Sequence, residues 1–534
     1  MKFFNITLSL SLAAAFCGCY RDDSTGYQIP LADVSISADD AISFSVGVEG
    51  TYEPTIEWGG TSESDYDYEW TDGGKEVISS DLILKHMFTT SGDHYLTFQM
   101  TDKKTGLVYG QDFKATVNSE FFLGWLVLSE GADKSSKLSF VGLSSFKSYP
   151  DIYATMFPDS PLGSSPVGFA CNDIRKTDQV TVIQNGGDGP VVLDGTSFKK
   201  VVNLSSEFIG GSFPEEAGGF KVKVIGYSHR GSDMIISENG KLYERTAPSV
   251  TLSSTKFQTT MFSTEPFISP AGDTKFTYMT FPGANSTITP IFDGGNNRWL
   301  AYYTTNTIPK QIPAFDKASG VEFDEGFDYC SGMASNVKMR YAQTYQDATQ
   351  NKEKLANVIE KNGSYYVNSA QLTLNTTSSH ITVSALEQSR IPSEYAISPD
   401  SKFYIPRGAS NSDFYDDLHV FFSIGKRVYF YHFDTGKAYL YHDFSKDSPA
   451  PSGDVVAMIQ NGNASQVGVA FSDGHLFICN LKKSILTSIR QNNIDPETYS
   501  AMVLAHIDDI PGTVVSLAFK YGKADNYTGS KIAK

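Results

Sequence analysis

Turns of the form Asn-Gly or Asp-Gly recur along residues 119–521, and they constrain the fold more than any other feature of the chain. The clearest copies are Asn239-Gly240, Asn362-Gly363 and Asp473-Gly474. In each copy one residue follows the glycine, and an apolar or aromatic pair comes next. Such a dipeptide between apolar segments is typical of a two-residue type I′ turn in a β-hairpin. The copies therefore predict a series of hairpins.

The spacing of these turns predicts a repeated unit. Looser copies add glycines to the series, which then comprises Gly195, Gly240, Gly295, Gly363, Gly425 and Gly474, on average about 56 residues apart. That is the size of a four-stranded propeller blade with its loops, and the span holds about seven such units. The apolar segments Gly124–Leu128 and Val514–Phe519 are expected to pair and close the ring, which removes exposed sheet edges. Two packed β-domains are the alternative, because the spacings are uneven.

Residues 31–118 show a different pattern, that of a compact β-sandwich. Val34–Ser37, Ala41–Val46 and Ser91–Asp102 alternate with period two, as half-buried strands do. The motif Gly-x-x-Tyr-x-x-x-x-x-Thr-Asp within the third segment, with Tyr68-x-Trp70 upstream, resembles the PKD-like domain of Bacteroidota surface lipoproteins. The resemblance implies a PKD/immunoglobulin-like sandwich in which Trp70 packs between two sheets. The whole chain is thus expected to be all-β, with this sandwich followed by a propeller.

The first thirty residues predict a lipid anchor. Lys2 and the apolar segment Leu8–Phe16 are typical of a cleaved signal peptide, here residues 1–18, and the segment is too short to span a bilayer. Gly18-Cys19 resembles a bacterial lipobox, which implies an acylated Cys19 and a tether over residues 19–30. The sequence Tyr20–Asp23 resembles the export signal of lipoproteins on the outer face of the outer membrane. At the other end, residues 522–534 are polar and expected to be loose.

Charge and cysteine content restrict the partners and the chemistry. The formal net charge of −17 disfavours nucleic-acid binding, which depends on basic residues that neutralise phosphates. Cys171, Cys330 and Cys479 are far apart and odd in number, which favours buried thiols over a disulfide framework.

No familiar catalytic motif is found in the sequence, so no catalytic residue, metal ligand or cofactor is expected. The glycine cluster 186–189 lies between two β-like segments and is interpreted as a hairpin turn. If Thr435-Gly436 is also a turn, His432 faces Tyr439 and Tyr429 faces His442, so the two histidines lie on opposite faces and share no metal. Asp65, Asp67 and Glu69 are interpreted as a solvated strand face, with a Ca²⁺ site as the alternative.

The segment Thr305–Met333 is the longest one without a clear strand pattern, and it holds the candidate contact residues. Phe323, Phe327 and Tyr329 lie there among acidic residues and are suited to stacking on a peptide or a sugar, or to docking on a partner. The alternative is an ordinary loop held in place by its own aromatic rings.

The family resemblance also implies a biological setting. PKD-like lipoproteins of this kind accompany SusC/SusD-type importers, so the expected function is an accessory outer-membrane surface lipoprotein. It would bind an oligopeptide or glycan nutrient without transforming it, beside the importer and other surface lipoproteins. A surface adhesin or assembly scaffold is one alternative, and a surface hydrolase with an unrecognised active site is another, because a sequence with 60 acidic residues cannot single out a catalytic pair.

Overall fold

The computed structural model describes residues 33–37, 42–171, 179–227, 232–246, 261–280, 288–303, 312–347, 352–375, 380–406, 414 and 417–521. The predictions for Cys19, for the rest of residues 1–30 and for residues 522–534 lie outside these ranges. The chain divides into two compact units, and the division does not fall at one residue. The smaller unit is formed mainly by Gly50–His86 and Asp93–Thr116, while Ser43–Glu49 and Met87–Gly92 group with the larger one.

The N-terminal part is a β-sandwich built on a five-stranded sheet in the order β2-β9-β8-β5-β6. Two pairs complete it, β1 with β4 and β3 with β7. The bounds are β1 Ser35–Ser37, β2 Ile42–Ser45, β3 Glu49–Tyr52, β4 Thr55–Glu57, β5 Tyr66–Asp72, β6 Glu76–Ser79, β7 Leu84–Met87, β8 Gly92–Asp102 and β9 Val108–Asn118, with the short 3₁₀ helix η1 at Glu63–Asp65.

Trp70 lies at the centre of the sandwich core, as predicted. It is fully buried, and its ring packs against Phe98 at 4.7 Å, Phe113 at 5.5 Å and Tyr52 at 6.0 Å between centroids. The indole nitrogen donates a hydrogen bond to the Asp81 carbonyl at 3.1 Å, so its polar atom is satisfied inside the core. The alternation along β8 buries Leu96, Phe98 and Met100 on one face, which confirms the period-two prediction.

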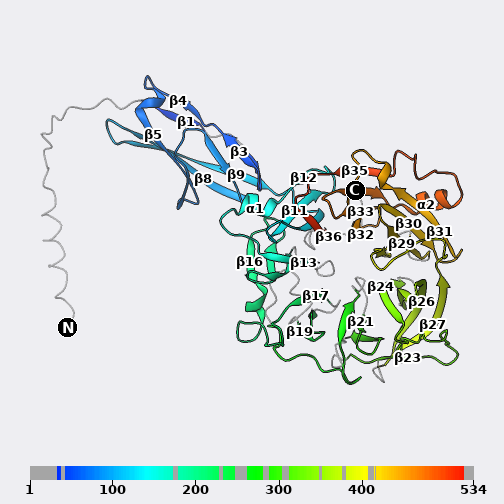
Figure 1. The fold of residues 1–534 in the computed structure, drawn as a ribbon. Helices are drawn as coiled ribbons and strands as arrows, with labels where there is room; N and C mark the ends of the chain where they lie inside the picture. The colour runs from blue at the N-terminus through cyan, green and yellow to red at the C-terminus, as the bar shows by residue number, and fades with distance from the viewer. Residues whose placement is uncertain are drawn as a thin grey trace, which may run out of the picture. The chain divides into compact units, whose positions relative to one another are not determined.

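The larger unit is a β-propeller, and its described residues form seven sheets around a ring (Figure 1). We number the sheets as blades 1 to 7 in chain order. Blade 1 contains β10 Gly124–Glu130, β11 Ser136–Gly142, β12 Ser148–Tyr149 and β36 Thr513–Lys520; blade 2 contains β13 Ser164–Cys171, β14 Gln179–Gly186, β15 Val191–Asp194 and β16 Lys200–Asn203; blade 3 contains β17 Val222–Tyr227, β18 Ser232–Ser237 and β19 Leu242–Thr246; blade 4 contains β20 Phe276–Met279, β21 Ile288–Asp293 and β22 Arg298–Tyr303. Blade 5 contains β23 Phe315–Lys317, β24 Val337–Asp347, β25 Lys352–Lys361, β26 Ser364–Asn375 and β27 His380–Arg390; blade 6 contains β28 Phe403–Tyr404, β29 His419–Ile424, β30 Arg427–His432 and β31 Lys437–Asp443; blade 7 contains β32 Val455–Gln460, β33 Gln466–Phe471, β34 Leu476–Asn480 and β35 Val503–Ile507.

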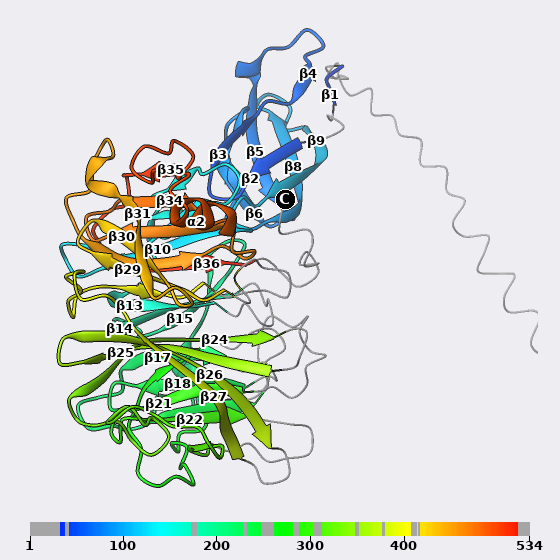
Figure 2. The same cartoon turned by 90° about the vertical axis from the view of Figure 1, so that its right-hand side faces the viewer.

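The ring is closed by the two ends of the propeller sequence. β36 pairs antiparallel with β10, and Trp125 lies opposite Phe519 in this pairing. The predicted pairing of the opening and closing apolar segments is therefore confirmed. β36 also lies beside β13 and β32, which places it on the inner wall of the ring. Figure 2 shows the propeller edge-on, with many strands running from one face of the ring to the other.

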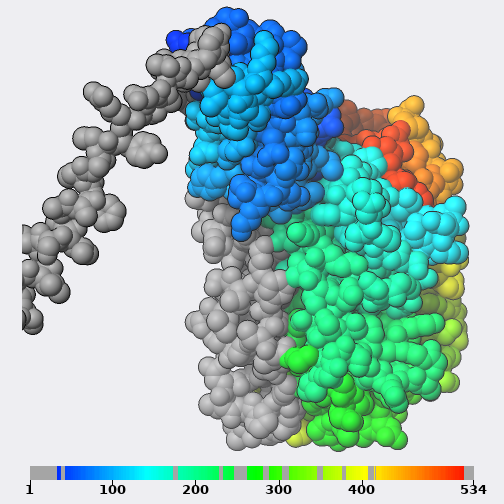
Figure 3. All heavy atoms as spheres, turned by 90° about the vertical axis from the view of Figure 1, so that its left-hand side faces the viewer, coloured from blue at the N-terminus to red at the C-terminus, as the bar shows by residue number. Residues whose placement is uncertain are grey.

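The predicted turns mark successive blades. Gly240, Gly295, Gly363, Gly425 and Gly474 each lie between two adjacent strands of one blade, in blades 3 to 7. Gly195 is out of step, because it follows β15, and the equivalent turn of blade 2 is the one at Gly187 and Gly189 between β14 and β15. Figure 3 shows the blades in chain order, because the colour of the surface passes from cyan to green along blades 1 to 4.

Turn type and one register differ from the prediction. Of the three clearest turns only Asn362-Gly363 has both residues at positive φ, as type I′ requires, whereas in the other two only the glycine does. The hairpin of β30 and β31 turns over residues 433–436 rather than at Thr435-Gly436 alone. As a result His432 faces Lys437, and a bulge beyond Tyr429 places His442 opposite Val428.

Helices are few. α1 covers Ile152–Met156 and α2 covers Lys483–Arg490, and the short 3₁₀ segments η2 Leu204–Glu207 and η4 Phe444–Lys446 follow strands of blades 2 and 6. In the described part of the chain no helix has the length and apolar character needed to cross a bilayer.

Candidate functional site

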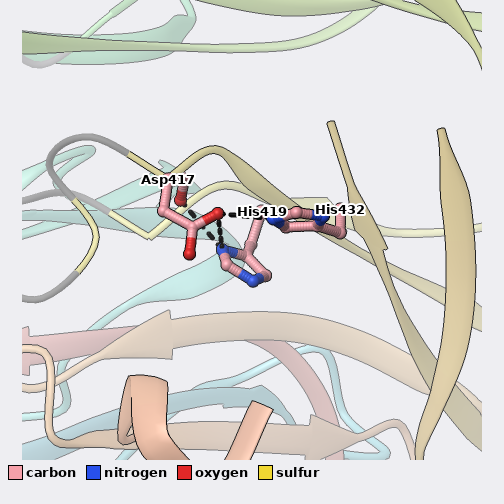
Figure 4. A group of neighbouring side chains, drawn as sticks. All are labelled: Asp417, His419 and His432. Atoms are coloured by element: carbon pink, nitrogen blue, oxygen red, sulfur yellow. Dashed lines mark hydrogen bonds and ion pairs between the residues drawn. The ribbon is translucent and has the colours of Figure 1, made fainter. Parts of the chain in front are cut away.

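Blade 6 holds a cluster of three buried polar residues, Asp417, His419 and His432 (Figure 4). His419 opens β29 and His432 closes β30, and the two lie directly opposite each other across the strand pair. Asp417 precedes β29 by two residues. The exposed fractions are 9% for Asp417, 1% for His419 and 4% for His432, so all three side chains need partners inside the protein.

Hydrogen bonds join the three residues. The His432 Nε2 atom lies 2.6 Å from Asp417 Oδ1, and its Nδ1 atom lies 2.9 Å from Thr435 Oγ1. His419 Nδ1 lies 2.8 Å from the backbone oxygen of Asp417, so this nitrogen carries the proton and donates. The ring of His419 also contacts Phe414 and Phe430, each at 5.7 Å between centroids.

Helix α2, inserted between β34 and β35 of blade 7, brings two cations to the same carboxylate. Lys483 Nζ lies 3.3 Å and Arg490 Nη2 lies 3.8 Å from Asp417 Oδ2, and Arg490 Nη1 also contacts His432 Nε2. The two residues are seven positions apart, so they lie on one face of the helix. Ile485, Leu486 and Ile489 are buried on its other side.

Burial and charge determine the protonation states in the cluster. Burial lowers the pKa of His419 to about 4, so this imidazole is neutral at pH 7. Burial alone would raise the pKa of Asp417, but the neighbouring His419, His432 and Lys483 outweigh it and hold the pKa below its ordinary value. Asp417 is therefore an ionised carboxylate with two cations beside it.

Asp417, His419 and His432 are residue types that bind transition metals, and their ligand atoms lie within 4.8 Å of one another. The contacts around these atoms nevertheless disfavour a bound metal ion. One carboxylate oxygen is already bonded to His432, and a divalent cation would face the like charges of Lys483 and Arg490. We interpret the cluster as an ion-pair network that fastens α2 of blade 7 to blade 6.

This network was not predicted from the sequence. His432 was expected to face Tyr439, which is a wrong register, and no local pattern connects Asp417 with Arg490, which lies 73 positions further along the chain. His442, the other histidine considered, lies 2.9 Å from Asp447 Oδ2 and 3.2 Å from the Pro496 oxygen, so it belongs to a different group of contacts.

A second candidate site is a groove on the N-terminal sandwich, with a volume of about 870 Å³. Trp58 and the tyrosines of β5 line it, together with polar residues of the loop before β5 and of the β8–β9 turn. The full lining is Trp58, Thr61, Ser62, Glu63, Ser64, Tyr66, Tyr68 and Lys103. The groove is open to solvent, and its combination of aromatic walls with a few polar groups is typical of ligand-binding surfaces.

Hydrogen bonds hold the wall of this groove in place. Tyr66 donates to Thr61 Oγ1 at 3.0 Å, and Tyr68 donates to the Glu63 carbonyl at 2.7 Å. Lys103 Nζ donates to the Ser64 carbonyl at 3.1 Å, and η1 is capped by Ser62. The loop that carries the polar groups is therefore tied to the sheet beneath it, which lowers the ordering cost of binding.

The aromatic surface of the groove is partly exposed. Trp58 and Tyr68 are half-buried, and the Trp58 ring lies 5.9 Å from the ring of the buried Tyr66. A smaller hollow of about 370 Å³ lies next to the groove and shares Trp58 and Glu63 with it. These two residues therefore line two neighbouring depressions, an arrangement suited to an elongated ligand.

Gly59 shows why the chain takes this path beside Trp58. Its φ is +54°, and a Cβ atom placed there would lie 2.2 Å from the backbone oxygen of Asp33. A residue with a side chain fits neither the conformation nor the space. Trp58 was not predicted as a site residue, because the residues around it form no motif and it lies outside the alternating strands.

The aromatic residues predicted as ligand or partner contacts lie elsewhere, in the loop before β24. Tyr329 is fully buried and Phe327 is 3% exposed, and both belong to the core shared by blades 4 and 5. Phe323 packs on Tyr329 at 4.7 Å between centroids. This corrects the prediction: we assign Phe327 and Tyr329 to the core, because buried rings offer no surface to a ligand. The segment also contains one strand, β23, which the pattern did not indicate.

The remaining candidates have structural roles. Asp65 caps η1 through Ser62, and Asp67 Oδ1 lies 3.4 Å from Lys103 Nζ. Cys330 and Cys479 are buried free thiols, as expected, whereas Cys171 is partly exposed. Burial raises the pKa of the Cys330 thiol to about 12, so this thiol stays protonated and unreactive.

Comparison with known proteins identifies one family. Residues 19–159 match the PKD-like family, a match that includes the sandwich and continues through β10 to α1 of the propeller. No curated protein sequence matches the chain.

The chain is similar to several solved structures at low sequence identity. A quinoprotein alcohol dehydrogenase-like protein from Bacteroides thetaiotaomicron is 11% identical, with a TM-score of 0.44 over 90% of this chain and 96% of that one. The periplasmic gluconolactonase of Pseudomonas aeruginosa is 11% identical, with a TM-score of 0.40 over 75% and 99%. The β-propeller domain of Cps50 from Myceliophthora thermophila is 8% identical, with a TM-score of 0.33 over 64% and 87%.

Proposed function

We propose that this protein is an accessory surface lipoprotein that captures a nutrient, a glycan or an oligopeptide, beside a SusC/SusD-type importer in the outer membrane. The observation that carries the proposal is the groove on the sandwich, in which aromatic rings and polar groups converge on a loop held by hydrogen bonds. Binding is the activity that such a surface supports, because aromatic rings and polar groups on a loop held in place can recognise a ligand without a large ordering cost.

Two observations support a location at the cell surface. Residues 19–159 match the PKD-like family, and the sequence of residues 1–23 resembles the signal of exported lipoproteins. Lipid attachment at Cys19 would tether the sandwich close to the membrane, because twelve residues reach at most about 3.3–3.6 Å each. Tethering raises the effective concentration beside an importer to roughly the millimolar range, so a modest affinity suffices for capture.

The first test is isolation from the native membrane. Gentle detergent extraction with an affinity tag after Lys534 should recover a SusC/SusD-like pair with this protein, and externally added protease should remove the protein from intact cells. Cys19→Ala should abolish membrane fractionation and, with it, recovery of the importer pair. Isolation of the tagged protein alone, or full membrane retention of the Cys19→Ala variant, would contradict the proposal.

A further inference from the structure

We infer that the sandwich groove binds a neutral oligosaccharide, with Trp58 as the stacking platform. This inference rests on the proposed function and names the ligand class for its binding site. Three features of the groove lead to it: the type of its walls, the strand that lines it and the state of its charges.

The walls match the chemistry of a sugar ring. A pyranose presents an apolar face of C–H groups and a rim of hydroxyls, and the half-buried rings of Trp58 and Tyr68 supply flat surfaces for the former. Around them Ser62 and Ser64 carry exposed hydroxyl groups that lie 2.9 Å from each other, and each hydroxyl oxygen keeps a further lone pair for a sugar hydroxyl. The Thr61 hydroxyl is already bonded to the Trp58 carbonyl and to Tyr66, so it holds the wall in place. No aliphatic side chain lines the larger groove, whereas Pro54, Ile56 and Leu82 line the smaller hollow beside it. An apolar peptide side chain therefore finds no pocket of its own next to Tyr68.

The lining strand disfavours a peptide further. Extended peptides gain affinity by adding a strand to a free sheet edge. The strand that supplies Tyr66 and Tyr68 is β5, an interior strand between β8 and β6. Recognition in the larger groove therefore depends on side chains, as in sugar binding, rather than on backbone pairing. Within the described residues, β4 beside the smaller hollow pairs with β1 alone, so it is the larger groove that disfavours strand addition.

The charges disfavour an acidic ligand. Lys103 is the only cation in the lining, and it is already engaged by Asp67 at 3.4 Å and by the Ser64 carbonyl. Glu63 contributes a carboxylate to both hollows, and the chain as a whole carries a net charge of −17. A polyanionic glycan would meet repulsion here, whereas a neutral one would not.

The two hollows set the length of the ligand. Because Trp58 and Glu63 lie between them, an oligosaccharide with one ring on Trp58 extends into both depressions, of about 870 and 370 Å³. A single monosaccharide occupies only one of them, so hexasaccharides are expected to bind more tightly than their monomers.

The test measures binding of defined probes to the full chain purified in detergent. Neutral hexasaccharides, namely maltohexaose, cellohexaose, xylohexaose and mannohexaose, are titrated alongside hexagalacturonate and a defined mixture of tryptic peptides. At least one neutral hexasaccharide should bind, and Trp58→Ala should weaken that binding about 5-fold or more, since an aromatic stacking contact contributes about 1 kcal/mol.

Matched variants separate loss of the platform from loss of the fold. Tyr95→Ala removes an aromatic ring that is 64% exposed on β8 and does not line the groove, so the affinity should be unchanged. Trp58→Tyr keeps a ring and should restore part of the affinity, with an unchanged thermal midpoint. Binding of hexagalacturonate or peptides in preference to all four neutral probes, or equal affinity of the Trp58→Ala variant, would overturn the inference. Absence of carbohydrate binding together with recovery of the importer pair would also overturn it, while leaving the role beside the importer intact.

Discussion

At the scale of single residues, the buried His419 links stability to pH. Its ring is 1% exposed, and its Nδ1 atom donates to the Asp417 carbonyl, while burial lowers its pKa to about 4. In the unfolded chain the pKa of a histidine is about 6.5, so between pH 6.5 and 4 the unfolded state binds more protons than the folded state. Stability therefore falls as the pH drops through this window, by on the order of 3 kcal/mol for a shift of this size.

We expect His419→Asn to flatten this pH dependence. The asparagine amide retains a donor for the Asp417 carbonyl but does not titrate, so the variant should lose less stability than the parent protein between pH 6.5 and 4. Urea-unfolding midpoints of both proteins at several pH values across the window measure the effect. Parallel curves for the two proteins would show that the acid sensitivity has another origin. The Asp417 carboxylate has a pKa below its ordinary value of 3.8, so it is lost as a charge only at a pH lower than this window.

Gly59 offers a second prediction at this scale. Because its φ is positive and a Cβ atom would collide with the Asp33 backbone, Gly59→Ala must shift the loop that carries Trp58. We expect oligosaccharide binding to fall at least as much as in Trp58→Ala, with a loss of stability of about 1–3 kcal/mol in the sandwich. Gly60→Ala is the matched control for space, since nothing lies within 4 Å of a Cβ atom there, although its φ of +90° also carries strain. Unchanged binding by the Gly59 variant would contradict the role of this loop.

At the scale of elements, closure of the ring depends on the pairing of β36 with β10. Phe519 is 2% exposed, and its ring contacts Trp125 at 5.2 Å between centroids, across blade 1. Phe519→Ala should destabilise the propeller by about 3–5 kcal/mol, because it removes a buried aromatic ring at the seam. Leu504→Ala, at a position that is 38% exposed on β35, serves as the control and should have a small effect. Chemical denaturation followed by tryptophan fluorescence compares the two, and equal midpoints would show that the seam contributes little.

Turns were the elements that the sequence predicted best, because glycine at positive φ is a local requirement. The turn at Asn362-Gly363 joins β25 to β26 as a two-residue loop, and both residues have positive φ. The hairpin of β30 and β31 was predicted in a wrong register, since a four-residue turn and a bulge between Val428 and Tyr429 are settled by packing rather than by local sequence. The same limit applies to Phe327 and Tyr329, whose burial depends on strands of blades 4 and 5 that are distant in sequence.

At the scale of the whole molecule, the period of the turns predicted about seven blades, and the described residues of the propeller form seven sheets. The uneven spacing has identifiable causes, such as the long strands of blade 5, where β26 alone has 12 residues, and the chain before β24 that adds β23. The aromatic groove was not predicted, because its lining combines a loop, an interior strand and a turn that only the folded sandwich brings together. Strand periodicity reports which residues are buried, and it carries no information about how loops converge.

The last prediction concerns independence of the larger part. All seven sheets of the propeller, including the closing pair β10 and β36, lie within residues 119–534, so a fragment that starts at Ser119 contains every strand needed to close the ring. The fragment should therefore be monomeric, with β-type circular dichroism and a cooperative unfolding transition, because pairing with β36 covers the edge of β10 and ties the two ends of the ring together. Ser43–Glu49 and Met87–Gly92 group with the larger unit, so the fragment should be less stable than the full chain. Aggregation that is cured only by restoring residues 31–118 would show that the sandwich is required for the propeller to fold.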